Sequence, residues 1–398
     1  MKKYMLNCLC PTIHPPASDW IKITAIDAHT GGELFRDRGK RRLKSALLKD
    51  NICSTSHSAL KFTAPSDWIK ITAIDAHTGG EPFRVIVDGL ELKGDTILRK
   101  NGDMPKRITI TLRTALMWEP RGHADMYRCL LRLPSRKRAD FGILFIHNED
   151  LAPCADTALS ALQPSSLETG MMPMVSPITE IKIDSPAGLI TAFAHIENDH
   201  VKNVSFLNVP SFVSELDANV DVPGLGKVRY DLAFGGGFYA YVNAKDVGVS
   251  CSPQDFRPLI EKGMAIKRAV MNSRQIVHPF EKDLGFLYGT IFVDEPQDPK
   301  SHSRNVCIFA DGEVDRSPTG TGVSGRLAIH YARGEVKLNE SIVIESIIGS
   351  KFTGGVVEET TFEIPMRRSS LRSEGKRISS AGTSCGSIQM IHSKMDLF

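Results

Sequence analysis

The segment Val314–Glu335 carries the densest set of residues that could bind or activate a small molecule. It reads VDRSPTGTGVSGRLAIHYARGE, in which Asp315 and Ser317 are both able to cap a helix and a helical pattern follows the proline. Small residues, among them Gly320 and Thr321, open that helix. Because a helix start presents backbone N–H groups and a favourable dipole, this segment predicts a site for an anion such as a carboxylate.

A second segment, Phe141–Leu162, has the same layout. It reads FGILFIHNEDLAPCADTALSAL: a buried strand pattern ends at His147, a polar loop follows, and Cys154 stands where a helix rich in small residues begins. A helix N-terminus favours the thiolate, so Cys154 is a candidate base or nucleophile, although a buried thiol without any chemical role would fit the same pattern. Thr319 occupies the equivalent place in the other segment. Two such arrangements suggest two similar lobes whose helix N-termini face one shared cleft and together bind a carboxylate.

The glycines of the first segment also match a dinucleotide-binding pattern. Gly320, Gly322 and Gly325 spell G-x-G-x-x-G, and Glu345 follows at a suitable distance on a strand pattern. However, Asp-Arg-Ser-Pro separates the preceding strand from the first glycine, and too little chain follows for the rest of a dinucleotide fold. A helix cap that binds no ligand remains as the plainer alternative.

Composition favours small-molecule chemistry. The chain has 398 residues with 41% hydrophobic content, which allows two domains, and 49 basic against 46 acidic side chains leave a net charge of +3. So small a charge provides no field for nucleic acid or an anionic membrane. No apolar run reaches the roughly 18 residues of a membrane span, and the start MKKYMLNCLC has no secretion-signal core, so we expect a cytosolic protein with no nucleic-acid or membrane partner.

The cysteines do not form a recognisable framework. There are eight of them, and none lies in a Cys-x-x-Cys pair: Cys8, Cys10, Cys53, Cys129, Cys154, Cys251, Cys307 and Cys385. This spacing argues against a disulfide scaffold and against a structural zinc site. We therefore expect mostly buried, reduced thiols and no bound metal.

One segment is duplicated without a change. SDWIKITAIDAHTGGE occurs at Ser18–Glu33 and again at Ser66–Glu81, and a single perfect copy is unlike the several diverged copies of a repeat protein. Only the second copy continues into an alternating strand pattern, EPFRVIVDG, whereas the first meets the charged stretch RDRGKRRLKSALLKD. We therefore treat residues 1–65 as an appendage that is loosely attached.

The remaining pattern predicts an α+β body of two lobes. Helical patterns cover 155–162, 252–271 and 322–332, and they do not alternate with the strands as in a doubly wound sheet. The predicted strands are 108–112, 141–147, 180–183, 189–195, 204–209, 238–242, 290–293, 306–310 and 341–345. From about residue 366 the chain is rich in Ser, Arg and Lys without periodicity, which predicts a poorly structured tail.

Several long stretches resemble the proline racemase family, and within it the dehydratases of trans-3-hydroxy-L-proline. In chain order, between Asp67 and about Thr360, they are IDAHTGGEPFRVIVDG, MWEPRGHADMY, FGILFIHNE, HPFEKDLGFLYGTIF, SRNVCIFADGEVDRSPTGTGV and SKFTGGVVEET. The resemblance implies a fold similar to that of diaminopimelate epimerase: two pseudo-symmetric lobes, each a curved sheet around a central helix, with the site between them. It also implies no cofactor and no metal, a small-molecule substrate and a homodimer.

The resemblance assigns residues and boundaries as well. It places residues 66–200 with 335–365 in the first lobe, which carries Cys154, and 201–334 in the second, which carries Thr319. Asp315 would hold the ring ammonium, while the backbone near Cys154, Ala155 and Asp156, together with Gly320 and Thr321, would bind the carboxylate. Tyr127 and Phe309 would line the ring, although capping by Asp315 and core packing by the two aromatics would explain the same residues.

Thr319 separates the activities that the resemblance implies. Racemases and epimerases of the family place a cysteine on each side of Cα, whereas the alcohol of Thr319 is far less acidic than a thiol. A single base, Cys154, can still remove the Cα proton while a 3-hydroxyl leaves. We therefore expect a hydro-lyase that converts trans-3-hydroxy-L-proline to 1-pyrroline-2-carboxylate, with a proline or 4-hydroxyproline racemase or epimerase as the alternative.

Around the first cysteine the chain departs from the family pattern. The family reads Asn-Glu-Gly-Tyr-Ser-x-Met-Cys-Gly-His, but this chain has NEDLAPCAD at 148–156, one residue shorter and without the glycine and histidine. Ala155 adds a methyl group at a close backbone approach, and Asp156 places a negative charge near a thiolate and a substrate carboxylate. A family member that binds a ligand without turnover is therefore a third hypothesis.

Overall fold

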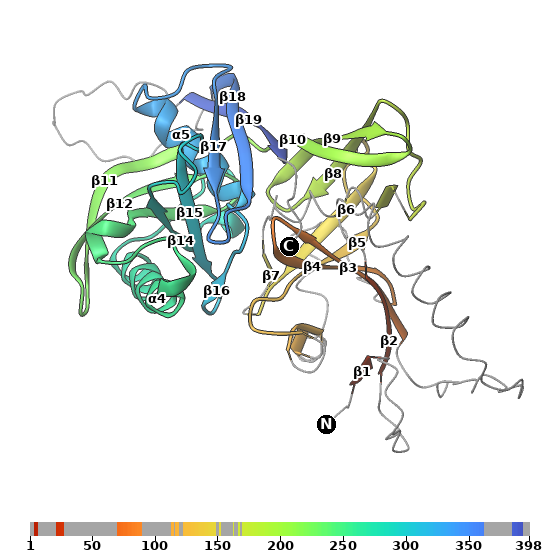
Figure 1. Ribbon diagram of the computed structural model, residues 1–398, viewed down its shortest axis with the longest axis horizontal. Helices are drawn as coiled ribbons and strands as arrows, with labels where there is room; N and C mark the ends of the chain where they lie inside the picture. The colour runs from red at the N-terminus through yellow and green to blue at the C-terminus, as the bar shows by residue number, and fades with distance from the viewer. Residues whose placement is uncertain are drawn as a thin grey trace, which may run out of the picture.

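The computed structural model has strands as its main elements, with two long helices in the described part of the chain (Figure 1). Side chains are described for residues 71–89, 113–114, 116–118, 122–148, 162, 166–167 and 169–359, and the backbone alone for 4–6, 21–27, 70, 151–152, 360–361 and 384–392. Within these ranges two lobes lie side by side, and both long helices belong to the second lobe.

The first lobe is a mixed sheet. Its strands are β3 (Lys70–Thr78), β4 (Glu81–Asp88), β5 (Tyr127–Arg132), β6 (Phe141–Ile146), β7 (Leu151–Ala152), β8 (Ile178–Ser185), β9 (Gly188–Glu197) and β10 (His200–Leu207). The strand β4 pairs in parallel with β5, β5 pairs antiparallel with β6, and β6 pairs in parallel with β8. The strands β8, β9 and β10 then form an antiparallel run.

The second lobe adds two helices to a similar sheet. It contains β11 (Phe212–Val222), β12 (Gly226–Phe234), β13 (Phe238–Asn243), η2 (Ala244–Val247), η3 (Pro253–Asp255), α4 (Phe256–Ser273), η4 (Lys282–Leu284), β14 (Leu287–Asp294), β15 (Ser303–Phe309), β16 (Glu313–Val314), α5 (Gly320–Ala332), β17 (Ser341–Glu345), β18 (Lys351–Thr361) and β19 (Ser384–His392).

The order of pairings is the same in both lobes. The parallel pair β13 and β14 is followed by antiparallel β15, by the short β16 paired to β15, by parallel β17 and by antiparallel β18 and β19. The strands β4 to β10 repeat this sequence of pairings step by step, with β7 in the place of β16. This repetition confirms the two-lobed α+β fold that the sequence predicts.

Helices α4 and α5 cover opposite faces of the second sheet. The strand residues that they contact show this, since successive side chains of a strand point to opposite faces. On one face, a Cβ added at Gly263 of α4 would meet Ile308 at 2.6 Å, and Thr290 donates a hydrogen bond to the Gly263 carbonyl (2.9 Å). On the other face, a Cβ added at Gly322 of α5 would meet Ile291 at 2.4 Å. The two glycines therefore let both helices sit close to the sheet.

The C-terminal strands correct two expectations. We expected 335–365 to complete the first lobe, but β17 pairs with β15 and β18 pairs with β17, so these strands extend the second sheet. The sequence also predicts a poorly structured tail after residue 366, whereas β19 lies there and pairs with both β18 and β10. This nine-residue strand was missed because the flanking segment is rich in Ser and Gly and shows no periodicity. It lies between the two lobes in Figure 1.

Most of the predicted strands and helices in the described ranges are confirmed. Strands β6, β8, β9, β10, β13, β14, β15 and β17 and helices α4 and α5 lie where the periodicity places them. The predicted strand 108–112 and most of the helix 155–162 lie outside the described residues. The hairpin of β11 and β12 was missed because its many charged residues, as in FVSELDANVDV, break the apolar alternation. No helix in the described part of the chain is long and apolar enough to cross a membrane.

Within residues 1–65 the structure describes two strands, β1 (Tyr4–Leu6) and β2 (Ile21–Asp27). The strand β2 belongs to the first copy of the duplicated segment and pairs in parallel, in register, with the identical residues of β3. Within the residues that the structure describes, only the second copy continues into a strand that packs in the core, and the residues that follow the two copies differ. Val85 and Ile86 of β4 are 0% and 2% exposed, and the first copy offers Asp37 and Arg38 at the equivalent places.

Replacing Val85 and Ile86 by Asp and Arg should therefore unfold the first lobe. Two charges would be buried without partners, which should lower the free energy of unfolding by more than about 4 kcal/mol in urea-induced unfolding. Val87→Asp, at a half-buried position of the same strand, is the matched control and should cost less than half as much. An unchanged urea midpoint for the double variant would show that β4 does not close the core.

Candidate active site

The start of helix α5 is fixed by a turn at Thr319. This residue occupies the N-cap position with φ 65° and ψ 101°, a conformation that a β-branched residue rarely adopts. Two hydrogen bonds hold it there: its N–H donates to the Ser317 hydroxyl (3.1 Å), and its carbonyl accepts from the Val323 N–H (2.7 Å). The surrounding turn therefore over-determines the strained backbone and fixes the direction of the Thr319 side chain.

Asp315 organises this turn. One carboxylate oxygen, Oδ1, accepts the Ser317 N–H at 2.8 Å, and the other, Oδ2, accepts the Thr319 hydroxyl at 2.8 Å. Its own N–H donates to the Cys307 carbonyl at 3.1 Å, which ties the turn to β15. Burial raises the pKa of Asp315 to about 6, although the hydrogen bonds from Ser317 and Thr319 act in the opposite direction. Asp315 thus caps the turn before the helix and holds the Thr319 hydroxyl.

The first turn of α5 is packed against two tyrosines of β13. The Tyr239 hydroxyl lies 2.6 Å from the Thr321 hydroxyl, and the Tyr241 hydroxyl donates to the Gly322 carbonyl at 2.7 Å. Gly320 and Thr321 are both buried and begin the helix, whose first-turn N–H groups have no acceptor within the helix itself. The sequence predicts an anion site at this helix start, and that role stays a prediction.

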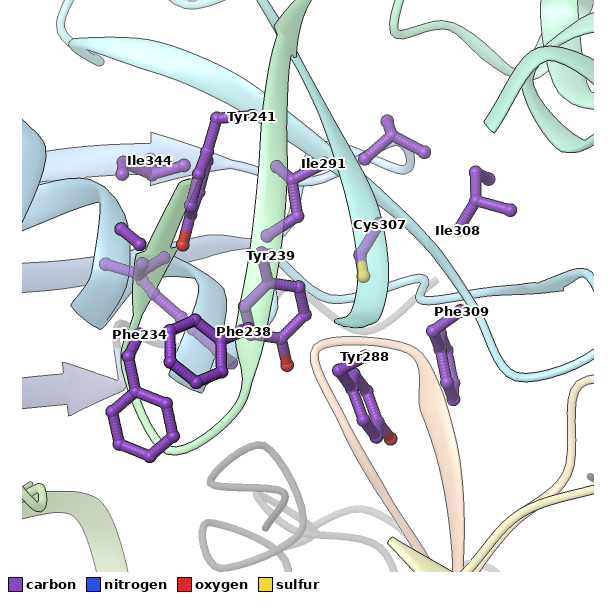
Figure 2. Packing of buried hydrophobic residues seen from close by; sticks show 14 of the residues in the cluster. Phe234, Phe238, Tyr239, Tyr241, Tyr288, Ile291, Cys307, Ile308, Phe309 and Ile344 are labelled. Carbon is purple, nitrogen blue, oxygen red and sulfur yellow. The ribbon is translucent and has the colours of Figure 1, made fainter. Parts of the chain in front are cut away.

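Cys307 lies directly behind Thr319, a contact that sequence reasoning missed. The thiol is completely buried on β15, and burial raises its pKa well above the ordinary range, while a hydrogen bond with Thr319 lowers it. Figure 2 shows Cys307 between Tyr239 and Phe309. Only the alternation along β15 could have indicated this, since Cys307 and Phe309 share one face of that strand.

Aromatic rings from both lobes meet beside this turn. Tyr127 of β5 and Phe309 of β15, which the sequence places in the site, have ring centroids 6.0 Å apart. Phe309 also stacks on Tyr288 at 5.5 Å, and the Tyr288 hydroxyl donates to the Tyr127 hydroxyl at 3.4 Å. His147 packs edge-on against Tyr288 at 5.8 Å, and burial lowers its pKa to about 3, so the ring is neutral.

A hairpin of the first lobe approaches the same turn. The strands β3 and β4 are joined by Gly79 and Gly80, whose φ values of 57° and 90° suit a tight turn that glycine adopts readily. A Cβ on Gly80 would meet Ile348 of the second lobe at 2.2 Å, and Ser350 donates to the Gly79 carbonyl at 2.8 Å. This contact brings Glu81, the first residue of β4, to the turn, where it accepts the Arg316 N–H at 2.9 Å.

The loop after β6 completes the contact between the lobes. The Asn148 N–H donates to Glu313 at 2.7 Å, and the Asn148 side-chain oxygen accepts the Asp311 N–H at 3.1 Å. Asp125 accepts the Val314 N–H at 3.3 Å. The β15–β16 connection is therefore held by the first lobe immediately before Asp315.

The structure does not describe Cys154, Ala155 and Asp156. That these residues face Thr319 therefore remains a prediction. The strand that precedes them is described: β7 pairs with β6 as β16 pairs with β15. In the sequence, Cys154 follows the end of β7 by two positions, whereas Thr319 follows the end of β16 by five. In the described part of the chain, no group of three or more His, Cys, Asp or Glu side chains could hold a metal ion.

Comparison with known proteins relates this site to one family. The family model described as proline racemase matches residues 73–367. A trans-3-hydroxy-L-proline dehydratase of Colwellia psychrerythraea is 47% identical over 280 residues, which are 70% of this chain and 79% of that protein. A 3-hydroxyproline 2-epimerase of Burkholderia multivorans is 41% identical over 279 residues, 70% of this chain and 83% of that one.

A solved structure has the same fold. The hydroxyproline epimerase of Agrobacterium vitis, with bound trans-4-hydroxy-L-proline, aligns with a TM-score of 0.72 and 32% identity over 81% of this chain and 89% of that one. The family match covers well over half of the chain and includes both the hairpin at Glu81 and the turn at Thr319. This chain therefore belongs to the proline racemase family.

Proposed function

We propose that this protein dehydrates trans-3-hydroxy-L-proline to 1-pyrroline-2-carboxylate. The observation that carries the proposal is the Thr319 hydroxyl, which is buried and hydrogen-bonded to Asp315 at the start of α5. A two-base racemase needs a second acid and base at this point. An alcohol cannot exchange a proton with Cα at neutral pH as a thiol can, so one base remains. The similarity to the Colwellia dehydratase supports the same assignment.

The chemistry needs a single proton acceptor on the protein. The Cys154 thiolate would take the Cα proton, the C–H electron pair would form the double bond to carbon 3, and the 3-hydroxyl on the same ring face would leave as water with the proton that Cys154 took, which restores the thiolate. The enamine then gains a proton at carbon 3 and loses one from nitrogen to give the cyclic imine. Charge developing on the carboxylate would be stabilised by N–H groups of Gly320 and Thr321, and by those near Ala155 and Asp156.

The other groups would orient the ring. Asp315 has both oxygens engaged by the turn, yet an ionised carboxylate accepts further hydrogen bonds and could hold the ring ammonium. Tyr127 and Phe309 come from different lobes and would pack against the apolar ring atoms between them. The expected homodimer and the cytosolic location remain part of this proposal.

Removal of the base is the first test. Cys154→Ala should abolish formation of 1-pyrroline-2-carboxylate from trans-3-hydroxy-L-proline, lowering kcat by at least about 10³-fold, because no other group would reach the Cα proton. Cys129→Ala, which removes a buried thiol of the first sheet, is the matched control and should retain activity. If wild-type protein forms no product while binding the planar mimic pyrrole-2-carboxylate, the chain is a ligand-binding relative that lacks turnover.

Thr319→Cys should introduce racemase or epimerase character. The new thiol would stand where a second acid and base is needed. The variant should therefore exchange the Cα proton of L-proline with heavy water, which NMR detects, and invert the configuration at Cα, which chiral chromatography detects. Thr319→Ser keeps the alcohol and should show neither exchange nor inversion. Inversion of proline by the wild-type protein would contradict the role given to Thr319.

The ionisation of Asp315 should appear in the pH profile. Since the carboxylate must be ionised to hold an ammonium and its pKa lies at about 6, kcat/KM should rise as pH increases through 6. Asp315→Asn should lose this acidic limb and lower kcat/KM by about 10²-fold or more. If kcat/KM of the wild-type protein stayed constant between pH 5 and 7, Asp315 would not be the group that binds the substrate ammonium.

A further inference from the structure

Glu81 lies opposite Asp315 across the boundary between the lobes. Its Oε2 accepts the N–H of Arg316, the residue that follows Asp315, and its Oε1 has no hydrogen-bond partner among the described residues. The residue is only 5% exposed. A buried carboxyl oxygen that lacks a donor is costly when the group is ionised. The geometry therefore favours the neutral acid in the substrate-free protein.

The surrounding charges favour the same form. Burial raises the pKa of Glu81 well above its usual value, and the negative charges of Asp315 and Glu313 raise it further, against the hydrogen bond from the Arg316 N–H and the positive charge of Arg316. The Arg316 guanidinium is 41% exposed and lies 3.5 Å from Asp125. The nearby Cys307 thiol adds no charge at neutral pH, because burial raises its pKa well above the ordinary range.

The two carboxyl groups thus ionise in order. With its pKa near 6, Asp315 is ionised in neutral solution, whereas burial and the charge of Asp315 hold the pKa of Glu81 well above its usual value, so Glu81 is the harder of the two to ionise. Neighbouring buried carboxyls commonly behave in this way, since the charge on the first opposes ionisation of the second.

We propose that Glu81 is the residue that gives up a proton when the cationic amino acid binds to Asp315. The inference rests on the proposed function in one respect, that Asp315 holds the ring ammonium. The incoming positive charge neutralises the charge of Asp315 and stabilises ionised Glu81, so binding and deprotonation favour each other. Glu81 acts through Asp315 and does not touch the substrate, which makes it a positioning residue supplied by the first lobe.

Two consequences distinguish this role from a structural one. Binding of a ligand with a positive nitrogen should release a proton, whereas binding of a ligand with an uncharged nitrogen should not. Affinity for the cationic ligand should also keep rising with pH above the range in which Asp315 ionises, because ionised Glu81 adds a second negative charge to the site.

Isothermal titration calorimetry of the full-length wild-type protein tests the first consequence without any variant. L-proline has no 3-hydroxyl and cannot be dehydrated, and pyrrole-2-carboxylate has the same carboxylate on an uncharged ring. In two buffers of different ionisation enthalpy near pH 7.5, proline should release up to about one proton per site and pyrrole-2-carboxylate close to none. Equal proton release by the two ligands would overturn the proposal.

Glu81→Gln assigns the proton to a residue. The variant keeps an acceptor for the Arg316 N–H but cannot ionise, so proline should bind without proton release and with an affinity that no longer rises above about pH 7. Glu295→Gln, at a carboxylate that is 79% exposed, is the control and should behave as wild type. Undiminished proton release by the folded Glu81 variant would contradict the proposal. Failure to dehydrate hydroxyproline would instead bear on the function alone, since proline binding needs no turnover.

Discussion

The hydrogen bond between Asp315 and Thr319 is the interaction on which the account of this molecule depends. A carboxylate in a buried turn is unfavourable unless donors surround it, and the Ser317 N–H and the Thr319 hydroxyl supply them. The backbone of Thr319 is held at φ 65° by its N–H, which donates to the Ser317 hydroxyl, and by its carbonyl, which accepts the Val323 N–H. The bond to Asp315 fixes the Thr319 side chain at the helix start. The turn therefore holds the strained backbone of Thr319, and the Asp315 carboxyl places the hydroxyl at its tip.

The repeated order of strand pairing explains how the site is built from both lobes. In the second lobe, β15, the short β16 and α5 deliver Phe309, Asp315 and Thr319 within one connection. The first lobe contributes Tyr127 from β5, the neutral His147 and, through the glycine turn of the β3–β4 hairpin, Glu81. Asn148 accepts the Asp311 N–H before Asp315, and Glu81 accepts the Arg316 N–H after it, so the relative position of the lobes and the electrostatics of the site are linked.

Sequence patterns predict the elements that carry the site better than the contacts between them. Helix α5 follows from its cap and glycines, and the placing of Tyr127 and Phe309 together from the family resemblance, whereas the hydrogen bond between Asp315 and Thr319 was not predicted. Cys307 and Glu81 did not stand out, because their roles depend on what lies across a sheet face or across the lobe boundary, and neither has a local signature. The strands β17 and β18 were assigned to the wrong lobe for the same reason: alternation identifies a strand but not its partner. Cys154 was predicted from its place before a helix, and its position relative to Thr319 remains a prediction.

A crystal structure of the protein with pyrrole-2-carboxylate tests the central claim most directly. The account predicts that the Cys154 sulfur and the Thr319 hydroxyl lie on opposite faces of the ring, each within about 3.5 to 4 Å of the carbon that bears the carboxylate. A sulfur turned away from that carbon, or a ligand bound elsewhere, would contradict it.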